Sequence, residues 1–315
     1  MERYKDHSEE VICSALQVLD QEVILITGSR DKTAVARRIL ALSSPALDEF
    51  GRIYAGHTAA IRGVTTTPLW VFTVDDNREI KKWSLRSSAP ICSVKLPLDR
   101  GVISFARYIP GPDREGVVLW GAFGGQVFGV SSRVLTDTKA ACVGKAVNFT
   151  TAECSVPDLN LIVTGSISGE VEAWDISPYT SGVSSRQLAQ DTLPSLRRWS
   201  IGASKHADEV SSLAVVKVEG QVGVATASLD LTGKPRSGVV ILLHFMSNPL
   251  PETVNLFSLP ALQCVKSFRL NDAPLIMASA DHVVVLGLRD CSTGIIDIDA
   301  DNVSYSASFH SEVSS

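Results

Sequence analysis

The sequence predicts an all-β fold built from repeats, and three observations lead to that prediction. Helical periodicity is nearly absent, and short runs rich in Val, Ile, Leu and Thr are separated by Gly, Asp, Asn and Ser. One phrase recurs, in which an apolar strand, a small-residue turn and an alternating strand end on Trp-Asp; it is clearest in GSISGEVEAWD at 165–175. The same pattern occurs at 73–83, after Gly56-His57, and in a degenerate form around 28–37. Such a repeat of paired strands is typical of a propeller blade.

The apolar runs divide into six repeats, each with enough strands for one blade. The first three repeats hold expected strands at 11–16, 22–27, 33–39 and 52–55; at 61–66, 70–74, 79–85 and 91–96; and at 102–108, 117–122, 126–131 and 139–143. The next three hold them at 146–152, 161–164, 170–176 and 196–201; at 210–218, 223–228, 253–259 and 262–268; and at 275–278, 283–288, 294–298 and 303–309. Each run is rich in β-branched residues and ends at turn-forming ones. We therefore expect residues 1–315 to form a single β-propeller domain of four-stranded blades.

Two segments leave the expected number of blades at six or seven. In the fifth repeat the apolar run 238–245 is a further candidate strand, so either a hairpin around 247–252 extends the third strand or a fragment of another blade lies there. Pro249 and Pro251 disfavour one continuous strand through that segment. The ending 310–315 repeats the opening of earlier repeats, so either it forms a closing strand or the chain is a piece of a longer protein.

Composition and charge narrow the classes of function. The 315 residues are 45% hydrophobic and 20% charged with a net charge of −5, which is ordinary for a globular protein and gives no basic field for direct nucleic-acid binding. The N-terminus lacks the apolar core of a secretory signal, and no apolar run could span a bilayer. The six cysteines show no metal-ligand spacing. We expect a cytoplasmic or nuclear protein that is not secreted and has no membrane insertion, metal or cofactor.

With its Gly-His start and its strand pair ending in Trp-Asp, the chain resembles the WD-repeat β-propellers along essentially its whole length, with a good motif in two repeats. The resemblance implies a hydrogen-bonded set of His, Ser or Thr, Asp and Trp within a blade. Repeat two offers His57, Thr73, Asp76 and Trp83, and repeat four offers Trp174 and Asp175, with Ser168 at the position of the turn Asp. Repeat one offers His7 and Asp31, but Arg37 fills the Trp position. The complete network is therefore expected in one blade at most.

Motifs of catalysis are missing from the sequence. There is no GxxxxGK[ST] phosphate loop and no GxSxG nucleophile elbow, and the six His residues are scattered. His57 and Asp76 could be read as an acid–base pair, but the resemblance assigns them to a structural network. We expect a chain that is not an enzyme and has no small-molecule substrate. The leading hypothesis is a scaffold subunit that binds peptides or domains of other proteins through propeller loops; the alternative is a motif- or modification-recognition module of an enzyme complex.

Candidate partner-binding residues lie on expected turns and on one outer strand. Arg62 and Arg78 belong to the turns of repeat two, on a mixed-charge edge suited to a protein partner. Arg197, Arg198 and Trp199 follow a Ser- and Gly-rich insertion, 177–195, that we expect to be mobile. A Trp beside two Arg has the composition of an interface hot spot. Trp199 could equally pack inward on its own blade, and the sequence leaves both possibilities open.

Overall fold

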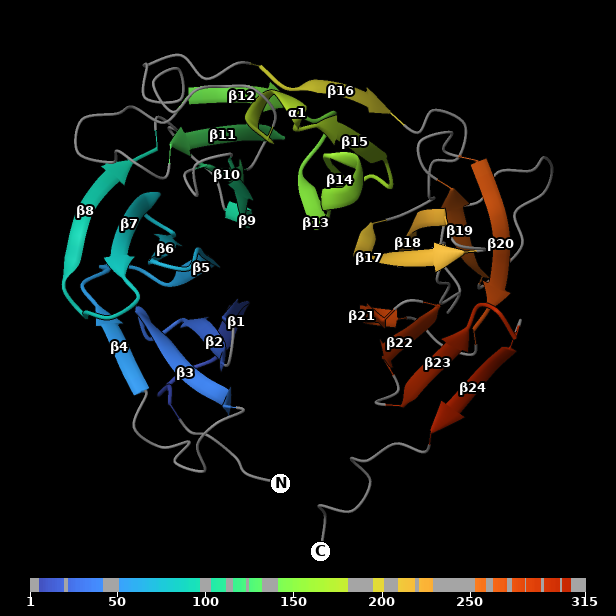
Figure 1. Ribbon diagram of the computed structural model, residues 1–315, viewed down its shortest axis with the longest axis horizontal. Helices are drawn as coiled ribbons and strands as arrows, with labels where there is room; N and C mark the ends of the chain where they lie inside the picture. Colours follow the sequence, from blue (N-terminus) through green and yellow to red (C-terminus); the bar gives the residue numbers. More distant parts are fainter. Residues whose placement is uncertain are drawn as a thin grey trace, which may run out of the picture. The chain divides into compact units, whose positions relative to one another are not determined.

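The computed structural model describes residues 6–19, 22–41, 51–96, 103–111, 116–122, 125–131, 141–180, 195–200, 209–218, 221–228, 253–258, 263–270, 274–280, 282–289, 292–300 and 302–306 (Figure 1). Within these ranges the strands form six four-stranded antiparallel sheets, each made of four consecutive strands. None of the described helices is long and apolar enough to cross a membrane.

The sheets are named A to F in chain order. Sheet A holds β1 (Val11–Leu19), β2 (Glu22–Ser29), β3 (Thr33–Ala41) and β4 (Gly51–Ala55); sheet B holds β5 (Ile61–Thr66), β6 (Trp70–Asp75), β7 (Glu79–Ser84) and β8 (Pro90–Lys95). Sheet C holds β9 (Ile103–Pro110), β10 (Gly116–Ala122), β11 (Gln126–Ser131) and β12 (Ala141–Lys145); sheet D holds β13 (Thr150–Val156), β14 (Leu161–Ser166), β15 (Val171–Asp175) and β16 (Arg197–Ser200). Sheet E holds β17 (Val210–Val218), β18 (Gln221–Ser228), β19 (Thr253–Ser258) and β20 (Gln263–Arg269); sheet F holds β21 (Pro274–Ala280), β22 (Val283–Leu288), β23 (Thr293–Asp297) and β24 (Asn302–Ser306).

The chain forms two compact units, and each contains three consecutive blades of a β-propeller. Unit 1 comprises Met1–Lys145 with Ile176–Leu196 and contains sheets A, B and C; unit 2 comprises Ala146–Asp175 with Arg197–Ser315 and contains sheets D, E and F. The all-β prediction and the prediction of four-stranded propeller blades are confirmed. Six sheets are present among the described residues, and the number of blades stays a prediction.

Within each unit, consecutive sheets pack face to face through apolar side chains. Ile26 of sheet A and Trp83 of sheet B belong to one fully buried cluster, and Phe72 of sheet B and Trp120 of sheet C belong to the next. Sheet B thus packs on a neighbour at each face, which is why every residue of β6 after Trp70 is buried. At about 25 cal/mol per Å² of apolar surface removed from water, these junctions supply most of the favourable free energy of folding.

The first strand of every sheet carries a β-bulge at its second residue. The bulged residues, inferred from the register shifts, are Ile12, Arg62, Ser104, Thr151, Ser211 and Leu275. A bulge inserts one extra residue, bends the strand and re-aims a side chain. Its recurrence places one redirected side chain at the same end of each sheet, a regularity that the sequence pattern did not reveal.

Several strand predictions differ from the structure, and the largest difference is at 146–152. That prediction is wrong, because β13 begins at Thr150. The preceding backbone forms a turn in which the N–H of Phe149 donates to Oδ1 of Asn148 at 2.8 Å and the N–H of Val147 donates to the Glu172 carboxylate. These two N–H groups therefore bond to side chains and not to a neighbouring strand.

Part of the insertion that we expected to be mobile is ordered. A short helix, α1 (Ser177–Thr180), opens it and buries Tyr179 completely. The candidate strand at 238–245 and the ending at 310–315 lie outside the described residues, so both alternatives for each stay open. In sheet E, Phe257 pairs with Val224 as Trp83 pairs with Val71 in sheet B, so Phe257 holds the Trp position of that sheet.

Candidate functional site

The polar network predicted for the second repeat is present in sheet B, with one correction. Nε2 of His57 lies 2.6 Å from Oγ1 of Thr73, which also accepts a hydrogen bond from Nε1 of Trp83 at 2.8 Å. Nδ1 of His57 lies 3.0 Å from Oδ2 of Asp75, and both side chains are fully buried. The carboxylate of the network therefore belongs to Asp75. The prediction that Asp76 supplies it is wrong.

The reason is the alternation of side chains along β6. Thr73 and Asp75 are two residues apart, so they lie on the same face of the strand, whereas Asp76 follows the strand end and pairs with Arg62 at 2.8 Å. Burial raises the pKa of Asp75, but hydrogen bonds from His57 and the N–H of Glu79 outweigh it and hold the pKa below its ordinary value. An ionised Asp75 only accepts, so a neutral His57 carries its proton on Nδ1 and accepts the Thr73 hydroxyl hydrogen at Nε2.

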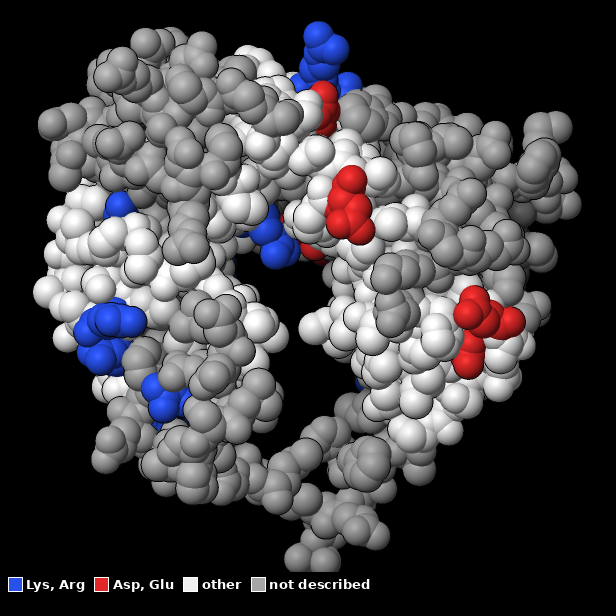
Figure 2. Space-filling model, viewed as in Figure 1, with Lys and Arg blue, Asp and Glu red and all other residues white. Residues whose placement is uncertain are grey.

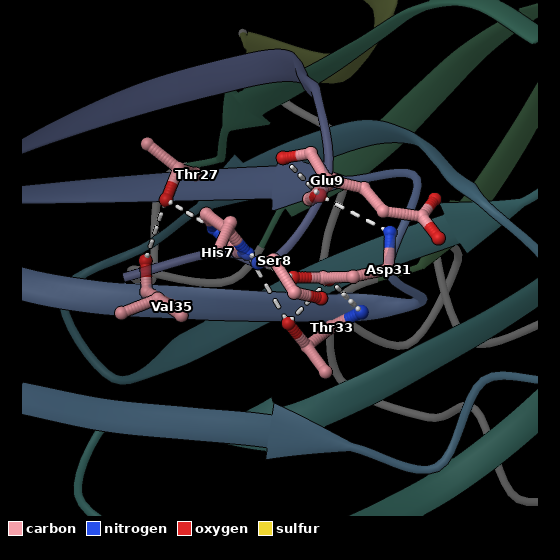
Figure 3. A network of polar contacts seen from close by, with 8 residues as sticks. His7, Ser8, Glu9, Thr27, Asp31, Thr33 and Val35 are labelled. Carbon is pink, nitrogen blue, oxygen red and sulfur yellow. Dashed lines mark hydrogen bonds and ion pairs between the residues drawn. The ribbon is translucent and has the colours of Figure 1, made fainter. Parts of the chain in front are cut away.

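Sheet A holds a second network of the same kind (Figure 3). His7 reaches Oδ2 of Asp31 through Nδ1 at 3.0 Å and Oγ1 of Thr27 through Nε2 at 2.9 Å. The other oxygen of Asp31 accepts from the N–H of Thr33 at 2.9 Å and from its hydroxyl at 2.6 Å. Burial raises the pKa of Asp31, but the bonds from Thr33, Ser8 and His7 lower it to a net value of about 2. The His–Thr–Asp set is thus present in two blades, although the complete set with Trp is found once among the described sheets.

Sheet A replaces the Trp of the network by an ion pair. Arg37 pairs with Leu25 as Trp83 pairs with Val71, so it lies in the Trp position as predicted. Its Nε donates to Asp6 at 2.8 Å, and a second guanidinium nitrogen also bonds that carboxylate. In sheet B the residue before the His is Gly56, whose open Cα faces the Trp83 ring. Sheets B and A therefore differ at both positions. The residue before the His is Gly56 in sheet B and Asp6 in sheet A, and the Trp position holds Trp83 in sheet B and Arg37 in sheet A.

Sheet D keeps half of the network. Nε1 of Trp174 donates to Oγ1 of Thr164 at 2.8 Å, as Trp83 does to Thr73. Ser166, which occupies the strand-end position of Asp75, donates to Glu170 at 2.7 Å, and Ser168 also bonds that carboxylate. Ser168 therefore lies in the turn, as expected, but the network position is that of Ser166. Asp175 is the half-buried last residue of β15, paired in register with Leu161 and Arg197.

A buried carboxylate in sheet D escaped the sequence analysis. Glu172 is 2% exposed, and its Oε1 accepts from a guanidinium nitrogen of Arg198 at 2.6 Å. The N–H of Val147 contacts both carboxylate oxygens, at 3.2 and 3.3 Å. Burial raises the pKa of Glu172, and Arg198 opposes that increase. Arg198, a predicted partner-binding residue, is thus committed to an internal ion pair, and it also lies 6.0 Å from the ring centre of Trp174.

The other predicted residues of this strand have different surroundings. Arg197 is exposed and pairs in register with Asp175. The backbone of Trp199 pairs with Ala173 in the ladder, but its side chain lies outside the described part of the chain. Whether Trp199 is an interface residue or packs inward stays a prediction.

The candidate binding surface is the edge of each sheet where two turns meet, which we call the rim. One turn precedes the first strand and the other joins the second and third strands. In three sheets the same backbone hydrogen bond joins them: Arg30 N–H to Glu10 oxygen at 2.9 Å, Asp76 N–H to Ala60 oxygen at 3.0 Å, and Ile167 N–H to Phe149 oxygen at 2.9 Å. A bond between backbone groups fixes the turns without constraining the side chain of the donor residue.

The rim of unit 1 carries alternating charges across sheets A and B. Nε of Arg30 lies 3.1 Å from Glu10, and Nε of Arg62 lies 2.8 Å from Asp76. The bond to Asp76 raises the pKa of Arg62, and the negative charge of Glu10 adds to this effect, so the two pairs are electrostatically linked. Arg78, the other predicted residue, occupies a left-handed backbone position at φ 66° in the same turn as Asp76. The structure thus brings Arg62 and Arg78 to one edge of sheet B.

On the face shown in Figure 2, the described charged side chains form small separate groups among uncharged described ones. Sheet D of unit 2 has a different rim. Val147 is 55% and Ile167 is 46% exposed, and Nδ2 of Asn148 donates to Ser168 at 2.8 Å between the same two turns. The same backbone frame therefore presents charge in sheets A and B and aliphatic side chains in sheet D.

One group of residues in the described ranges has the geometry to hold a metal ion. The ligand atoms of His57, Asp75 and Glu79 lie within 4.8 Å of one another. Both nitrogens of His57 already serve the blade network, and the ammonium of Lys81 lies 2.7 Å from Glu79. We therefore assign these side chains to the structural network. The partly buried thiol of Cys13 is unsuited to nucleophilic chemistry, because desolvation raises its pKa to about 12.

Comparisons with known proteins concern the fold. No protein-family model matches the chain. No curated protein matches it either. Among the solved structures that match is the crystal structure of Ika8, a computationally designed protein, with a TM-score of 0.60 and 18% sequence identity. The superposition covers 95% of this chain and 75% of that one. The likeness shows the fold alone.

Proposed function

We propose that this chain is a non-enzymatic protein-interaction scaffold, a divergent WD-repeat-like propeller of six or seven blades that serves as a subunit of a multiprotein complex. Its partners are peptides or domains of other proteins, and the rim binds them. The protein works in the cytoplasm or nucleus. It does not bind nucleic acid directly, does not insert into a membrane and acts on no small-molecule substrate.

The observation that carries the proposal is the repeated hydrogen bond of the rim. Arg30, Asp76 and Ile167 hold equivalent backbone positions, yet one is a cation, one an anion and one aliphatic. A rigid frame that varies only in its side chains is how repeat proteins build surfaces for large partners. The surface ion pairs of the rim contribute about 0–1 kcal/mol each to stability, so the fold does not require them. Their arrangement is better explained by recognition.

The absence of enzymatic activity is supported by the use of the titratable groups described. The buried His and Asp residues of sheets A and B are bonded to one another and to Thr hydroxyls, which leaves them a structural role. The alternative function, a module that reads a short motif or modification for an enzyme complex, uses the same rim. It predicts a preference for one short peptide, whereas a scaffold binds folded domains over a larger area.

The test compares rim variants with a matched control. Arg30→Glu/Arg62→Glu reverses two rim charges, and Arg86→Glu reverses an exposed charge in the turn at the other end of sheet B. Native extract is passed over each immobilised protein, and stoichiometric partners are identified. We expect the double variant to lose partners that the wild type and Arg86→Glu retain, with melting temperatures within a few degrees. Identical partner sets for all three proteins would remove the rim from the proposal.

A further inference from the structure

The turns that join the second and third strands share one backbone feature. In four sheets the third residue after the end of the second strand has a positive φ: 70° at Lys32, 66° at Arg78, 78° at Gly125 and 86° at Gly169. In the turns of Lys32, Arg78 and Gly169, the N–H of that residue donates to the carbonyl oxygen of the last strand residue at 3.3, 2.8 and 3.1 Å. The four turns are therefore equivalent, and their left-handed position belongs to the repeat.

Sheets C and D hold glycine at this position, whereas sheets A and B hold a cation. Glycine is the usual residue, because it has no Cβ to meet the backbone when φ is positive. Asn and Asp are the side chains that adopt the conformation most readily, since they can hydrogen-bond to the nearby backbone. A Lys or an Arg has no such compensation and strains the turn. Two neighbouring sheets of unit 1 thus carry a positive charge where folding alone favours glycine.

The buried carboxylates of the two sheets do not account for these cations. Asp31 already accepts from His7 and from the N–H and the hydroxyl of Thr33. Asp75 accepts from His57 and from a backbone N–H of its own turn. Each carboxylate is therefore satisfied by hydrogen bonds within its blade, and neither needs the cation of the turn as a partner.

The other carboxylates of these turns are mostly paired. The ion pairs are Glu10 with Arg30, Asp76 with Arg62, and Glu79 with Lys81. Within the ranges that the structure describes, Glu9 is exposed and has no bonded cation, and Lys32 is exposed and has no bonded carboxylate. Glu9 does not have a positive φ, so its charge carries no backbone strain. The strain is found at the cations alone.

The spacing of the two turns indicates what kind of anion fits. Sheets A and B pack face to face within unit 1, and packed sheets lie about 10 Å apart. An extended peptide rises about 3.3 Å per residue, so about three residues span that distance. Lys offers a point charge, and Arg offers a planar fork that can bind a carboxylate through two parallel hydrogen bonds. The complement is an extended segment with carboxylates about three residues apart.

We propose that Lys32 and Arg78 bind an acidic segment of a partner protein, with one Asp or Glu carboxylate on each cation. The inference rests on the proposed function, because it names the partner that the rim of sheets A and B takes. The strained positions are retained because the charge that they carry is used in binding.

The test selects peptides from a displayed library of random dodecapeptides on the purified full chain. We expect the selected sequences to be enriched in Asp and Glu at intervals of about three residues. One selected peptide is then labelled, and its affinity is measured by fluorescence anisotropy. Lys32→Gly/Arg78→Gly should bind it at least about tenfold more weakly, because two charge-assisted contacts are lost while the turns keep their conformation. The control Arg86→Gly removes an exposed charge at the other end of sheet B and should bind as the wild type does.

Melting separates a structural role from a binding role. Glycine relieves the backbone at both positions, so Lys32→Gly/Arg78→Gly should melt at the wild-type temperature or a few degrees above it. A decrease of several degrees would show that the cations stabilise the fold and would overturn the proposal. Selected peptides without acidic residues would do the same, as would an unchanged affinity of the glycine variant. A gain of more than about tenfold on replacing the acidic residues with phosphoserine would assign the site to phosphate instead of carboxylate.

This inference and the proposed function can fail separately. If Arg30→Glu/Arg62→Glu loses partners from native extract and Lys32→Gly/Arg78→Gly retains all of them, the rim stands as a binding surface and the acidic-segment site is overturned. If the glycine variant loses the selected peptide and the charge-reversal variant retains every partner, the acidic-segment site stands and the scaffold role assigned to the rim is overturned.

Discussion

Removing Arg198 should destabilise unit 2 by leaving a buried carboxylate without its cation. The perturbation is Arg198→Ala, and the group left behind is Glu172, which is 2% exposed and bonded to Arg198 at 2.6 Å. Removing one partner of a fully buried ion pair costs about 3–5 kcal/mol. The Arg198 side chain is 35% exposed, so water screens part of the interaction, and the N–H of Val147 still donates to the carboxylate. We expect a loss of about 2 kcal/mol in the free energy of unfolding.

The loss should depend on pH with a definite sign. Burial raises the folded-state pKa of Glu172 above its ordinary 4.5, and removing Arg198 raises this pKa further. A carboxyl with a raised folded pKa is penalised above that pKa and relieved below it, because the protonated form needs no cation. The deficit of Arg198→Ala should therefore be largest near neutral pH and shrink as the pH falls toward the ordinary pKa of 4.5.

The assay is urea denaturation followed by Trp fluorescence, at neutral and at mildly acidic pH. The matched control is Glu172→Gln/Arg198→Ala, in which an amide replaces the charge, and it should recover most of the lost stability. If Arg198 serves only a partner, Arg198→Ala will match the wild type to within about 0.5 kcal/mol, as exposed substitutions usually do. Either that result or a deficit that does not change with pH would refute the assignment of Arg198 to Glu172.

Three further predictions concern the networks of sheets A and B. His57→Ala should lower the free energy of unfolding by about 2–3 kcal/mol without loss of partner binding, because Asp75 keeps a buried charge without its donor; unchanged melting with abolished binding would contradict this. A double-mutant cycle of Asp6→Ala and Arg37→Ala should give a coupling of about 1 kcal/mol that decreases at high salt, since both side chains are 21% exposed; additivity would show that the ion pair is energetically idle. The folded pKa of about 2 for Asp31 lies below its ordinary 3.8, so its contribution, roughly 1–2 kcal/mol after allowance for solvent screening, is present above about pH 4 and lost as the pH falls toward 2. Asp31→Asn should flatten that part of a plot of urea midpoint against pH, and an unchanged slope would be inconsistent with this role.

Much of the fold could be predicted because side chains alternate between the two faces of a strand, and this period of two residues is visible in the sequence. The expected strands at 61–66, 126–131, 210–218 and 283–288 coincide with β5, β11, β17 and β22. In the network, choosing between Asp75 and Asp76 required knowing where β6 ends, and a shift of one residue moves a side chain to the other face. The spacing of two residues from Thr73 was the signal that favoured Asp75.

Other features depend on partners that are distant in sequence, which periodicity cannot supply. Arg37 in the Trp position signals a missing motif residue, but nothing near it in sequence points to Asp6 as its partner. Glu172 lies in an alternating strand, and its bonding partners, Arg198 and the N–H of Val147, are both about 25 residues away in sequence.

The backbone bond that closes the rim has a consequence for how this protein can change. Because it joins an amide N–H to a carbonyl, any residue except proline at positions 30, 76 and 167 preserves it. Under the proposed function, substitutions at these positions change what the rim binds and have little effect on folding. A library randomised at these three sites, with proline excluded, should consist mostly of folded proteins that differ in the surface of the rim.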